Sequence, residues 1–308
     1  MTAHTIHRDR HHFGWNNANA PVLRIAPGET VRFEVVDASG GQLGRSSTVD
    51  DVGRLDFARV NPVTGPVFVE RAEPGDALAV EIVDFEPSGW GWTAIIPGFG
   101  LLADDFPDPF LHISAYGAGG VEFAPGIRLP VRPFPGTIGV APAEPGQHSI
   151  VPPRDVGGNM DIRDLTRGAR LWLPVQCPGA LFSVGDTHAA QGDGEVCGTA
   201  IESPMAIQLR FELRKAAGLR RPQFLLPSAP TRHVDERGYY ATTGIAPDLM
   251  QAAKDAVRDM IDYLGREYAL APEMAYALCS VAVDLRISEV VDVPNWVVSA
   301  YLPRSIFL

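Results

Sequence analysis

Side chains that could bind a metal or move a proton crowd into one short stretch, residues 185–195. Within eleven residues the chain places three acids, one histidine, one glutamine and three glycines. The candidates are Asp186, His188, Gln191, Asp193 and Glu195. Carboxylates this close repel one another unless protons or a cation neutralise them. The composition therefore favours a divalent-metal site.

The spacing within this stretch supports a shared ion. An apolar run at 181–184 predicts a buried strand just before it, and on an extended chain residues two apart face the same side. Asp186 and His188 would therefore point together, and the glycines that follow would let Asp193 and Glu195 fold back toward them. Mixed oxygen and nitrogen ligands suit Zn²⁺ or Mn²⁺, while mainly oxygen ligands favour Ca²⁺ or Mg²⁺. The alternative is that an acidic, glycine-rich turn is only a solvated loop.

Two further segments carry candidates. Residues 157–161 place Asn159 and Asp161 two apart after a glycine pair, so the two side chains could share a face, although an Asx-type turn is the simpler interpretation. Glu202 ends an apolar strand that continues from the first stretch. It could be a buried general base, a partner of His188, or a solvent-facing acid.

The cysteines offer a different kind of chemistry, because a thiolate can act as a nucleophile. Cys197 lies beside the acids, which raise a thiol pKa and oppose its activation, so we interpret it as core filling, with a nucleophile as the alternative. The chain has three cysteines, an odd number without metal or redox spacing, and no Gly-x-Ser-x-Gly motif. Four histidines near the N-terminus could bind metal adventitiously, but a frayed terminus is the better interpretation.

The elements that must position these side chains are mostly strands. Segments 30–37 and 77–84 alternate between apolar and polar residues and each follows a Pro-Gly-acidic turn, which is typical of sandwiches and jelly rolls. Residues 86–135 read as an excursion of loops and short strands, or a lid. The proline density at 129–142 predicts neither helix nor central strand there. Short apolar runs at 171–175 and 180–184, and the alternation at 206–213, predict further strands.

Helices are expected only late in the chain. Apolar positions from Leu249 to Leu264 follow helical spacing after Pro247 and Asp248, and 272–283 predicts a second, shorter helix with Pro272 near its start. A strand is expected at 285–291. The fold class is thus mainly β, a jelly-roll-like β-sandwich domain at 1–205 with an α+β C-terminal region at 206–308. Within the first domain, 86–135 is a loop or small-barrel excursion.

The bulk properties exclude several partners. The 308-residue chain has a formal net charge of −11, which gives no electrostatic reason to bind nucleic acid and repels anionic membranes. No apolar run reaches the roughly 20 residues that span a bilayer, and residues 1–12 lack the apolar core of a signal peptide. We expect a small neutral substrate, no nucleic-acid or membrane partner, and a cytoplasmic location.

Several separated motifs resemble the acetamidase/formamidase family over most of the chain. The strongest is 185–195, continuing through 198–202, and the others lie at 37–42, 62–70, 134–142, 157–165 and 173–175. The resemblance implies hydrolysis of short linear amides to a carboxylate and ammonia, a jelly-roll-like sandwich, a bound divalent metal, and a homodimer or higher oligomer. It departs at Asn61, where a histidine is expected, and the first twenty residues match poorly, so activity or specificity could differ.

The resulting hypothesis is hydrolysis by a metal-activated water. The metal ligands would come from Asp186, His188, Asp161 and Asp193, with zinc or calcium as the favoured ion. The catalytic candidates are Glu195, Glu202 and Gln191, and the substrate-binding candidates are Asn159, Gly158 and Gly192. A carboxylate would take the water proton and deliver it to the leaving nitrogen. The alternative from another class is a non-catalytic β-sandwich with a structural Ca²⁺ or a small-ligand site.

Overall fold

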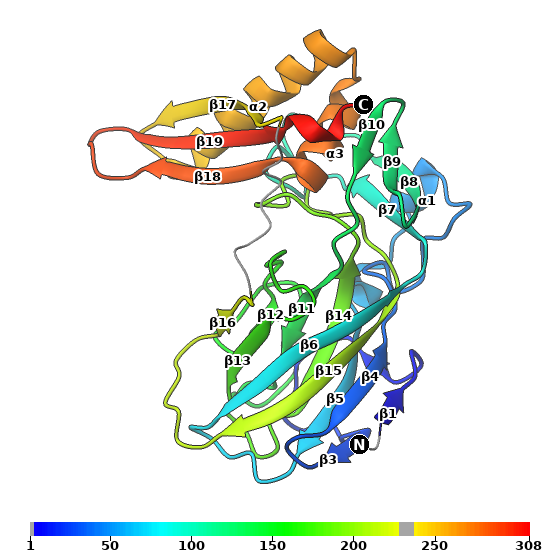
Figure 1. Ribbon diagram of the computed structural model, residues 1–308, viewed down its shortest axis with the longest axis vertical. Helices are drawn as coiled ribbons and strands as arrows, with labels where there is room; N and C mark the ends of the chain where they lie inside the picture. The colour runs from blue at the N-terminus through cyan, green and yellow to red at the C-terminus, as the bar shows by residue number, and fades with distance from the viewer. Residues whose placement is uncertain (1–2, 228–236) are drawn as a thin grey trace.

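The computed structural model describes residues 3–227 and 237–308. The chain is mainly β, as predicted, and its helices are concentrated after residue 248. Figure 1 shows a sandwich of two sheets in the lower half and a second part, built from late elements and a small meander, in the upper half. A jelly-roll order of strands stays a prediction.

The first sheet of the sandwich contains the two longest strands of the described residues, which pair antiparallel. Its order is β1 (Ala3–Ile6), β4 (Thr30–Glu34), β15 (Met205–Arg214), β6 (Ala77–Pro87), β13 (Arg170–Pro174) and β16 (Gln223–Leu225). In β4 the apolar Val31 and Phe33 are fully buried and their polar neighbours are not. The predicted period of two therefore places one face of this strand in the core.

The second sheet carries the stretch singled out by the sequence. Its order is β12 (Gly157–Asn159), β11 (Phe134–Gly139), β14 (Phe182–His188), β5 (Val63–Val69) and β2 (His11–His12), and β3 (Leu23–Ile25) pairs with β5. Between the two sheets, the rings of Phe33, Phe182 and Phe211 contact one another edge to face or tilted, at centroid distances of 4.9–6.2 Å. Buried aromatic packing of this kind fixes how one sheet sits on the other.

Two expectations about strands were wrong. The proline-rich segment around Phe134 forms β11, which pairs on both sides. The pairing with β12 begins only at Thr137, so Pro135 has a strand neighbour on one side alone, at Thr187 of β14. The N-terminus is not frayed either, because β1 and β2 each join a sheet and His12 Nε2 lies 2.9 Å from Ser183 Oγ.

The excursion at 86–135 forms a four-stranded meander. Its order is β10 (Ile127–Leu129), β9 (Gly120–Ala124), β8 (Phe110–Gly117) and β7 (Trp90–Ile95). Most of its buried apolar side chains share one core with the C-terminal helices, so the excursion packs with the last part of the chain, while Trp92 and Ala94 belong to a separate small cluster. Since β15 and β16 lie in the sandwich, we propose that the boundary of the C-terminal region falls after Leu225 and not at residue 206.

The C-terminal region places two helices on a three-stranded sheet, β17 (Tyr239–Ala246), β19 (Trp296–Pro303) and β18 (Asp284–Glu289). Helix α2 (Leu249–Tyr268) begins where the Asp248 carboxylate accepts a hydrogen bond from Gln251 N, and it continues past Gly265. Helix α3 (Pro272–Ala282) begins at Pro272, as expected. The short helices are α1 (Val49–Val52), η1 (Phe57–Arg59) and η2 (Arg304–Ile306). Within the described residues, none of the helices has the length and apolarity needed to cross a membrane.

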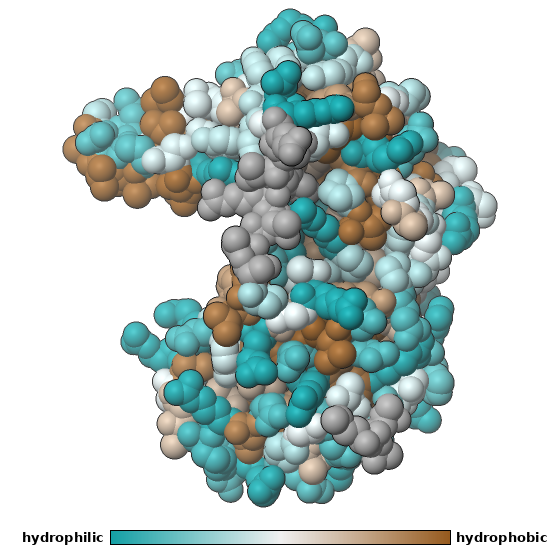
Figure 2. Space-filling model, viewed as in Figure 1, coloured by the Kyte–Doolittle hydropathy of each residue, from teal (hydrophilic) through white to brown (hydrophobic). Residues whose placement is uncertain are grey.

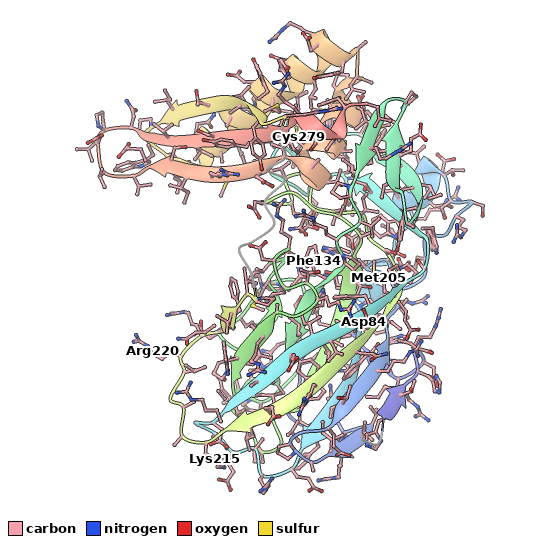
Figure 3. The ribbon with its side chains drawn as sticks, viewed as in Figure 1. Asp84, Phe134, Met205, Lys215, Arg220 and Cys279 are labelled. Atoms are coloured by element: carbon pink, nitrogen blue, oxygen red, sulfur yellow. The ribbon has the colours of Figure 1, made fainter. Side chains whose placement is uncertain are left out.

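The two parts of the molecule enclose a hollow, and the candidate site lies where they join. Figure 2 shows a hollow between the sandwich and the projecting β17–β19 sheet, whose outer end carries apolar side chains. In Figure 3, Phe134 lies at the junction of the sandwich and the upper part, Lys215 lies at the far end of the sandwich, and Cys279 lies in the upper part. His188, at the end of β14, lies at the same junction, because it pairs with Phe134 of β11.

Candidate active site

Strand β14 carries Asp186 and His188 to the end of the sandwich. The strand is longer than predicted and runs through His188, so both residues belong to the strand and not to a following loop. Their side chains face the same way, as expected, with His188 Nε2 3.1 Å from Asp186 Oδ1. Both residues are almost completely buried. The His188 ring also packs edge-on against Phe134, with centroids 4.9 Å apart.

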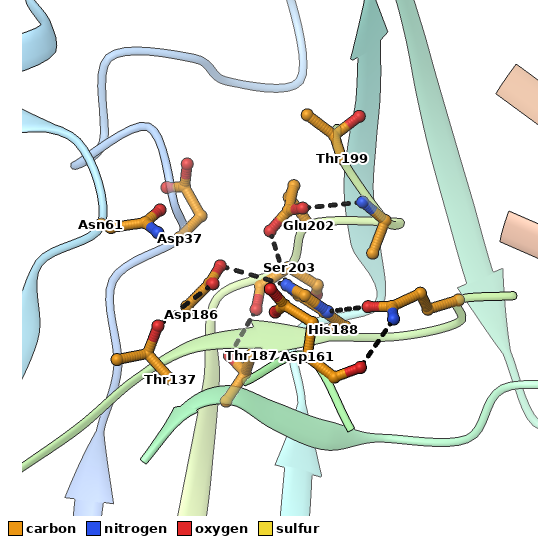
Figure 4. A network of polar contacts seen from close by, with 12 residues as sticks. Asp37, Asn61, Thr137, Asp161, Asp186, Thr187, His188, Thr199, Glu202 and Ser203 are labelled. Carbon is orange, nitrogen blue, oxygen red and sulfur yellow. Dashed lines mark hydrogen bonds and ion pairs between the residues drawn. The ribbon is translucent and has the colours of Figure 1, made fainter. Parts of the chain in front are cut away.

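The side chain of Gln191 orients the histidine (Figure 4). Gln191 Nε2 donates a hydrogen bond to the Asp161 carbonyl oxygen at 2.9 Å, which turns Oε1 toward His188 Nδ1, also at 2.9 Å. An amide oxygen can only accept, so this contact assigns the hydrogen to Nδ1. In a neutral ring the lone pair of Nε2 then faces the carboxylates.

Four carboxylates surround that nitrogen. One group consists of a His188 nitrogen and oxygen atoms of Asp161 and Asp186, which all lie within 4.8 Å of one another. A second group consists of a His188 nitrogen and oxygen atoms of Glu195 and Glu202, within the same distance. Glu202 Oε2 and Asp186 Oδ1 each lie 3.1 Å from His188 Nε2. Because Nε2 carries at most one hydrogen, it can donate to only one of the two carboxylates, and the angles fit a hydrogen bond to Asp186. Among the described residues, Glu202 Oε2 and Asp161 Oδ1 are buried side-chain atoms without a hydrogen-bond partner.

Burial and mutual repulsion shift the acids of this cluster. Burial, together with the Asp186 charge, raises the pKa of Asp161 to about 7, and burial raises the pKa of Glu202 to about 8. Burial also raises the pKa of Glu195 well above its ordinary value. Burial opposes charging of His188, but the Glu202 and Asp186 carboxylates outweigh it and raise the pKa of the imidazole. Burial likewise works against an ionised Asp186, yet His188 keeps the pKa of that carboxyl low.

The donor set fits a divalent cation. An imidazole nitrogen and carboxylate oxygens are zinc ligands, and buried oxygens without partners are the atoms that a cation would satisfy. Gly136 of β11 leaves room for this arrangement. A methyl group at that position would lie 2.6 Å from Asp161 Oδ1, 2.7 Å from His188 Cε1 and 2.9 Å from Asp186 Oδ2. The cluster thus rests on a residue that has no side chain.

The backbone around the cluster is also unusual. Asp161, Asp186 and Glu195 all have positive φ, at 51°, 54° and 44°. For residues other than glycine this conformation costs on the order of 1–3 kcal/mol each, and it persists only where the surrounding structure holds the backbone in place. The three acids converge because the backbone is held in this conformation.

A cavity of about 500 Å³ opens over the cluster. Asp161, Asp186, Glu195 and Glu202 line it, so the buried cluster can be reached by a small molecule. Asn159 and Asn61 line the same cavity, and Asn61 Nδ2 donates to Asn159 Oδ1 at 3.2 Å. Thr137 Oγ1 donates to the same oxygen at 2.6 Å. The Asn159 side-chain amide is therefore held with its oxygen occupied.

Three sequence candidates lie elsewhere. Asp193 is half-exposed and forms an ion pair with Arg163 at 3.2 Å, because the glycine-rich turn carries it toward β18 and not back to the cluster. Gly192 packs against the Val283 backbone, where a Cβ would lie 2.0 Å from the carbonyl oxygen. Gly158 packs near the Trp15 indole. None of these three residues is among those that line the cavity in the described chain.

The thiol of Cys197 does not reach the cavity. It is fully buried, its sulfur lies 3.5 Å from the carbonyl oxygens of Ala94 and Thr199, and burial raises its pKa. This environment suits core filling, as the sequence suggested. All three cysteines are buried and free.

Sequence reasoning overlooked two residues that shape the site. Gly136 floors the cluster, and Arg163 joins the site to the C-terminal region by donating to the Gln191 carbonyl oxygen at 3.1 Å and to Asp284 Oδ1 at 2.5 Å. Gly136 lies within the motif at 134–142 that resembles the family, so the sequence did mark this position. Arg163 follows Asp161 by two residues, but nothing in the sequence marks its partner Asp284.

Buried carboxylates and a histidine at the floor of an open cavity form a cluster that could hold a metal ion within reach of a small molecule. The chain belongs to the acetamidase/formamidase family, whose sequence profile matches residues 2–150 and 145–308. It is 30% identical to the formamidase of Methylophilus methylotrophus over 96% of this chain and 89% of that one. It is 27% identical to the acetamidase of Mycolicibacterium smegmatis over 87% and 84%.

Solved structures agree with this assignment. The gamma lactamase from Delftia acidovorans superposes with a TM-score of 0.89 at 28% identity, over 97% of this chain and 89% of that one. The acetamidase from Bacillus halodurans gives a TM-score of 0.70 at 31% identity, over 97% and 96%. The chain is accordingly an amidase that hydrolyses linear amides, and the expectation of a non-catalytic sandwich is set aside.

Proposed function

We propose that a single divalent cation held by the cluster assists amide hydrolysis. Its ligands would be Asp186, His188, Asp161 and Glu202. The observation that carries the proposal is the orientation of the His188 ring: Nδ1 contacts the Gln191 side-chain oxygen, so Nε2, 3.1 Å from both Asp186 Oδ1 and Glu202 Oε2, is the nitrogen that could bind an ion together with these carboxylates. When bound, such an ion acidifies water and polarises a carbonyl oxygen. Glu202 replaces Asp193 in the ligand set expected from the sequence.

The division of labour between the two glutamates follows from how each is held. Glu202 Oε1 accepts a hydrogen bond from Ala200 N at 2.8 Å, which fixes the carboxylate with Oε2 toward His188. Glu195 lines the cavity and has a raised pKa from burial. A carboxyl group that can be protonated near neutral pH can accept a proton from water and return it to the leaving nitrogen. We therefore assign Glu195 as general base and acid, and Glu202 as ligand.

Asn159 is the proposed substrate-binding residue. Its side-chain oxygen accepts from Thr137 and Asn61, so its Nδ2 is the group left to face the cavity. An N–H donor there would bind the substrate carbonyl oxygen and stabilise the charge that develops on it. Gln191 is then a positioning residue, which acts on the reaction through His188.

The donors favour zinc over calcium as the bound ion. One imidazole nitrogen with carboxylate oxygens favours Zn²⁺, whereas Ca²⁺ would need more oxygen ligands, with water supplying some of them. Elemental analysis of the purified protein decides between these two.

The test is ammonia release from acetamide and formamide. We expect activity that falls after chelation, returns with added Zn²⁺, and is lost in His188→Ala. Full activity in the chelated enzyme and in His188→Ala alike would contradict the metal proposal while leaving the amidase assignment intact.

A cyclic amide is a second candidate substrate. The observation that favours it is the TM-score of 0.89 with a protein described as a gamma lactamase. A five-membered lactam is a secondary amide, so it shares with acetamide the carbonyl group and the carbon–nitrogen bond to be cleaved. Ring opening of pyrrolidin-2-one, followed as formation of the amino acid, tests this candidate directly.

We also propose assembly as a homodimer or higher oligomer in the cytoplasm. The projecting sheet exposes apolar side chains, namely Ile245, Ile287, Val290, Val291 and Val293. Apolar groups gathered on such an arm support a protein–protein contact. Three buried, free cysteines fit a reducing compartment. Light scattering of the purified protein tests the assembly, and a monomer at micromolar concentration would contradict it.

A further inference from the structure

The cavity over the cluster is larger than formamide or acetamide requires. Its volume is about 500 Å³. Acetamide has four non-hydrogen atoms, which at the roughly 30 Å³ that a water molecule takes up in the liquid would fill about a quarter of that space. The volume falls in the range of pockets that hold much larger organic ligands.

The inner wall of the cavity is apolar and rigidly held. Trp92 and Leu55 are buried members of one small apolar cluster, and Ile96 packs against it. The Trp92 indole Nε1 donates to Asp37 Oδ1 at 3.0 Å, and that buried carboxylate also accepts from Ser39 N at 3.0 Å. Apolar packing and the hydrogen bond from Nε1 therefore fix the orientation of the Trp92 ring, so a ligand would meet a rigid apolar surface.

The mouth of the cavity is apolar as well. Phe57, Phe99 and Val151 line it with 63%, 45% and 39% of their surfaces exposed. These three exposed side chains come from segments that are far apart in the sequence, so it is the fold that brings them together at the mouth. Apolar side chains gathered at the mouth of a pocket mark a surface that a ligand covers.

The charge of the cavity is one-sided. Its described lining contains four carboxylates at the floor and no lysine, arginine or histidine. Even with the proposed divalent cation bound, four ionised carboxylates leave the floor negatively charged, so a substrate with its own carboxylate would be repelled in a partly buried site, which costs free energy. The lining therefore selects against charged acyl groups as well as accommodating apolar ones.

We propose that the preferred substrates are primary amides of uncharged, apolar acyl groups with about six to eight carbon atoms. Such an amide has about eight to ten non-hydrogen atoms and would fill roughly half to three fifths of the cavity. Its amide group would lie at Glu195 and Asn159, and its acyl group would extend past Trp92 to Phe99. The inference rests on the proposed function of the cluster and adds the substrate class.

The experiment compares kcat/KM for ammonia release from four amides: acetamide, hexanamide, phenylacetamide and the half-amide of adipic acid. Burial of each methylene group is expected to raise kcat/KM about fourfold where the contact is complete. Because the mouth is partly exposed, hexanamide should exceed acetamide by at least about tenfold, and the charged half-amide should fall well below hexanamide. Acetamide equal to hexanamide, or equal use of the half-amide, would overturn the inference.

Variants locate the effect. Phe99→Ala should lower the ratio of hexanamide to acetamide kcat/KM by about fivefold, since it removes apolar contact area from the mouth. The matched control is Phe224→Ala in β16, which is 42% exposed and is not part of the described cavity lining. Val151→Ala is a second variant should Phe99→Ala fail to fold. An equal ratio in the control and in both mouth variants would contradict the inference. No ammonia from any amide would contradict the proposed function as well, whereas acetamide turnover without this preference contradicts the inference alone.

Discussion

The side-chain oxygen of Gln191 lies 2.9 Å from His188 Nδ1, and this contact decides which ring nitrogen faces the carboxylates. Replacement of Gln191 by Met removes the acceptor and leaves the ring free to adopt the other tautomer. Loss of such a supporting partner costs a metal site about 10- to 100-fold in affinity. Gln191→Met should therefore bind Zn²⁺ more weakly by that factor, as measured by competition with a chelator.

The conservative change separates orientation from folding. Gln191→Glu keeps an acceptor for Nδ1, loses the hydrogen bond to the Asp161 carbonyl oxygen and adds a negative charge, which favours a bound cation. It should retain more metal affinity than Gln191→Met. Equal affinity in the wild type and in Gln191→Met would show that the tautomer does not matter.

A methyl group at Gly136 should close the site. Its Cβ would lie under 3.0 Å from Asp161, His188 and Asp186, so at least one ligand must move. We expect Gly136→Ala to lose metal and at least about 100-fold of kcat/KM, because misplacement by about 1 Å has this cost. The control is Gly119→Ala, where a Cβ meets nothing within 4 Å. An active Gly136→Ala enzyme with full metal content would refute the role of this position.

The two glutamates should fail in different ways. Glu195→Gln removes the proposed base, so kcat should fall by about 10²- to 10⁴-fold while the metal content stays unchanged. Glu202→Gln removes a ligand, so the metal content should fall first and activity should recover in part at high Zn²⁺. Parallel measurement of kcat and metal stoichiometry checks the assignment. The reverse pattern would exchange the two roles.

Metal affinity should rise with pH. In the metal-free protein, burial raises the pKa of Asp161 to about 7 and that of Glu202 to about 8, so both are protonated in mildly acidic solution. Metal binding needs the deprotonated forms and must release these protons. Affinity should therefore fall as pH drops through 8 and 7, and calorimetry in buffers of different ionisation enthalpy should detect proton release. No proton release at pH 6.5 would contradict the burial argument.

The strands and helices were largely accessible from the sequence. Period-two alternation identified β4 and β6, and helical spacing after Asp248 identified α2. Strand β4 and helix α2 each pack one face against a core, and a local pattern predicts such a face, whereas the first four residues of β6 are buried on both faces. Strand β11 was missed because its pairing with β12 begins beyond Pro135, and a pairing register is not a local property.

The site was accessible only in part. Asp186 and His188 lie two apart on one strand, so their shared face followed from local geometry. The convergence of Asp161, Glu195 and Glu202 depends on positive φ angles and on contacts between distant segments, which spacing does not encode. Asp193 was misplaced for the same reason, since the direction of a glycine-rich turn depends on what it packs against, here Arg163 and β18.

The central claim is that one divalent cation, held around His188, is needed for amide hydrolysis. The most direct measurement is to titrate Zn²⁺ into chelated enzyme while recording ammonia release. Both groups of potential ligands include His188, so the account predicts activity that rises linearly and reaches a plateau at one ion per chain. Chelated enzyme that is already fully active, or a rise that follows two or more ions per chain, would contradict it.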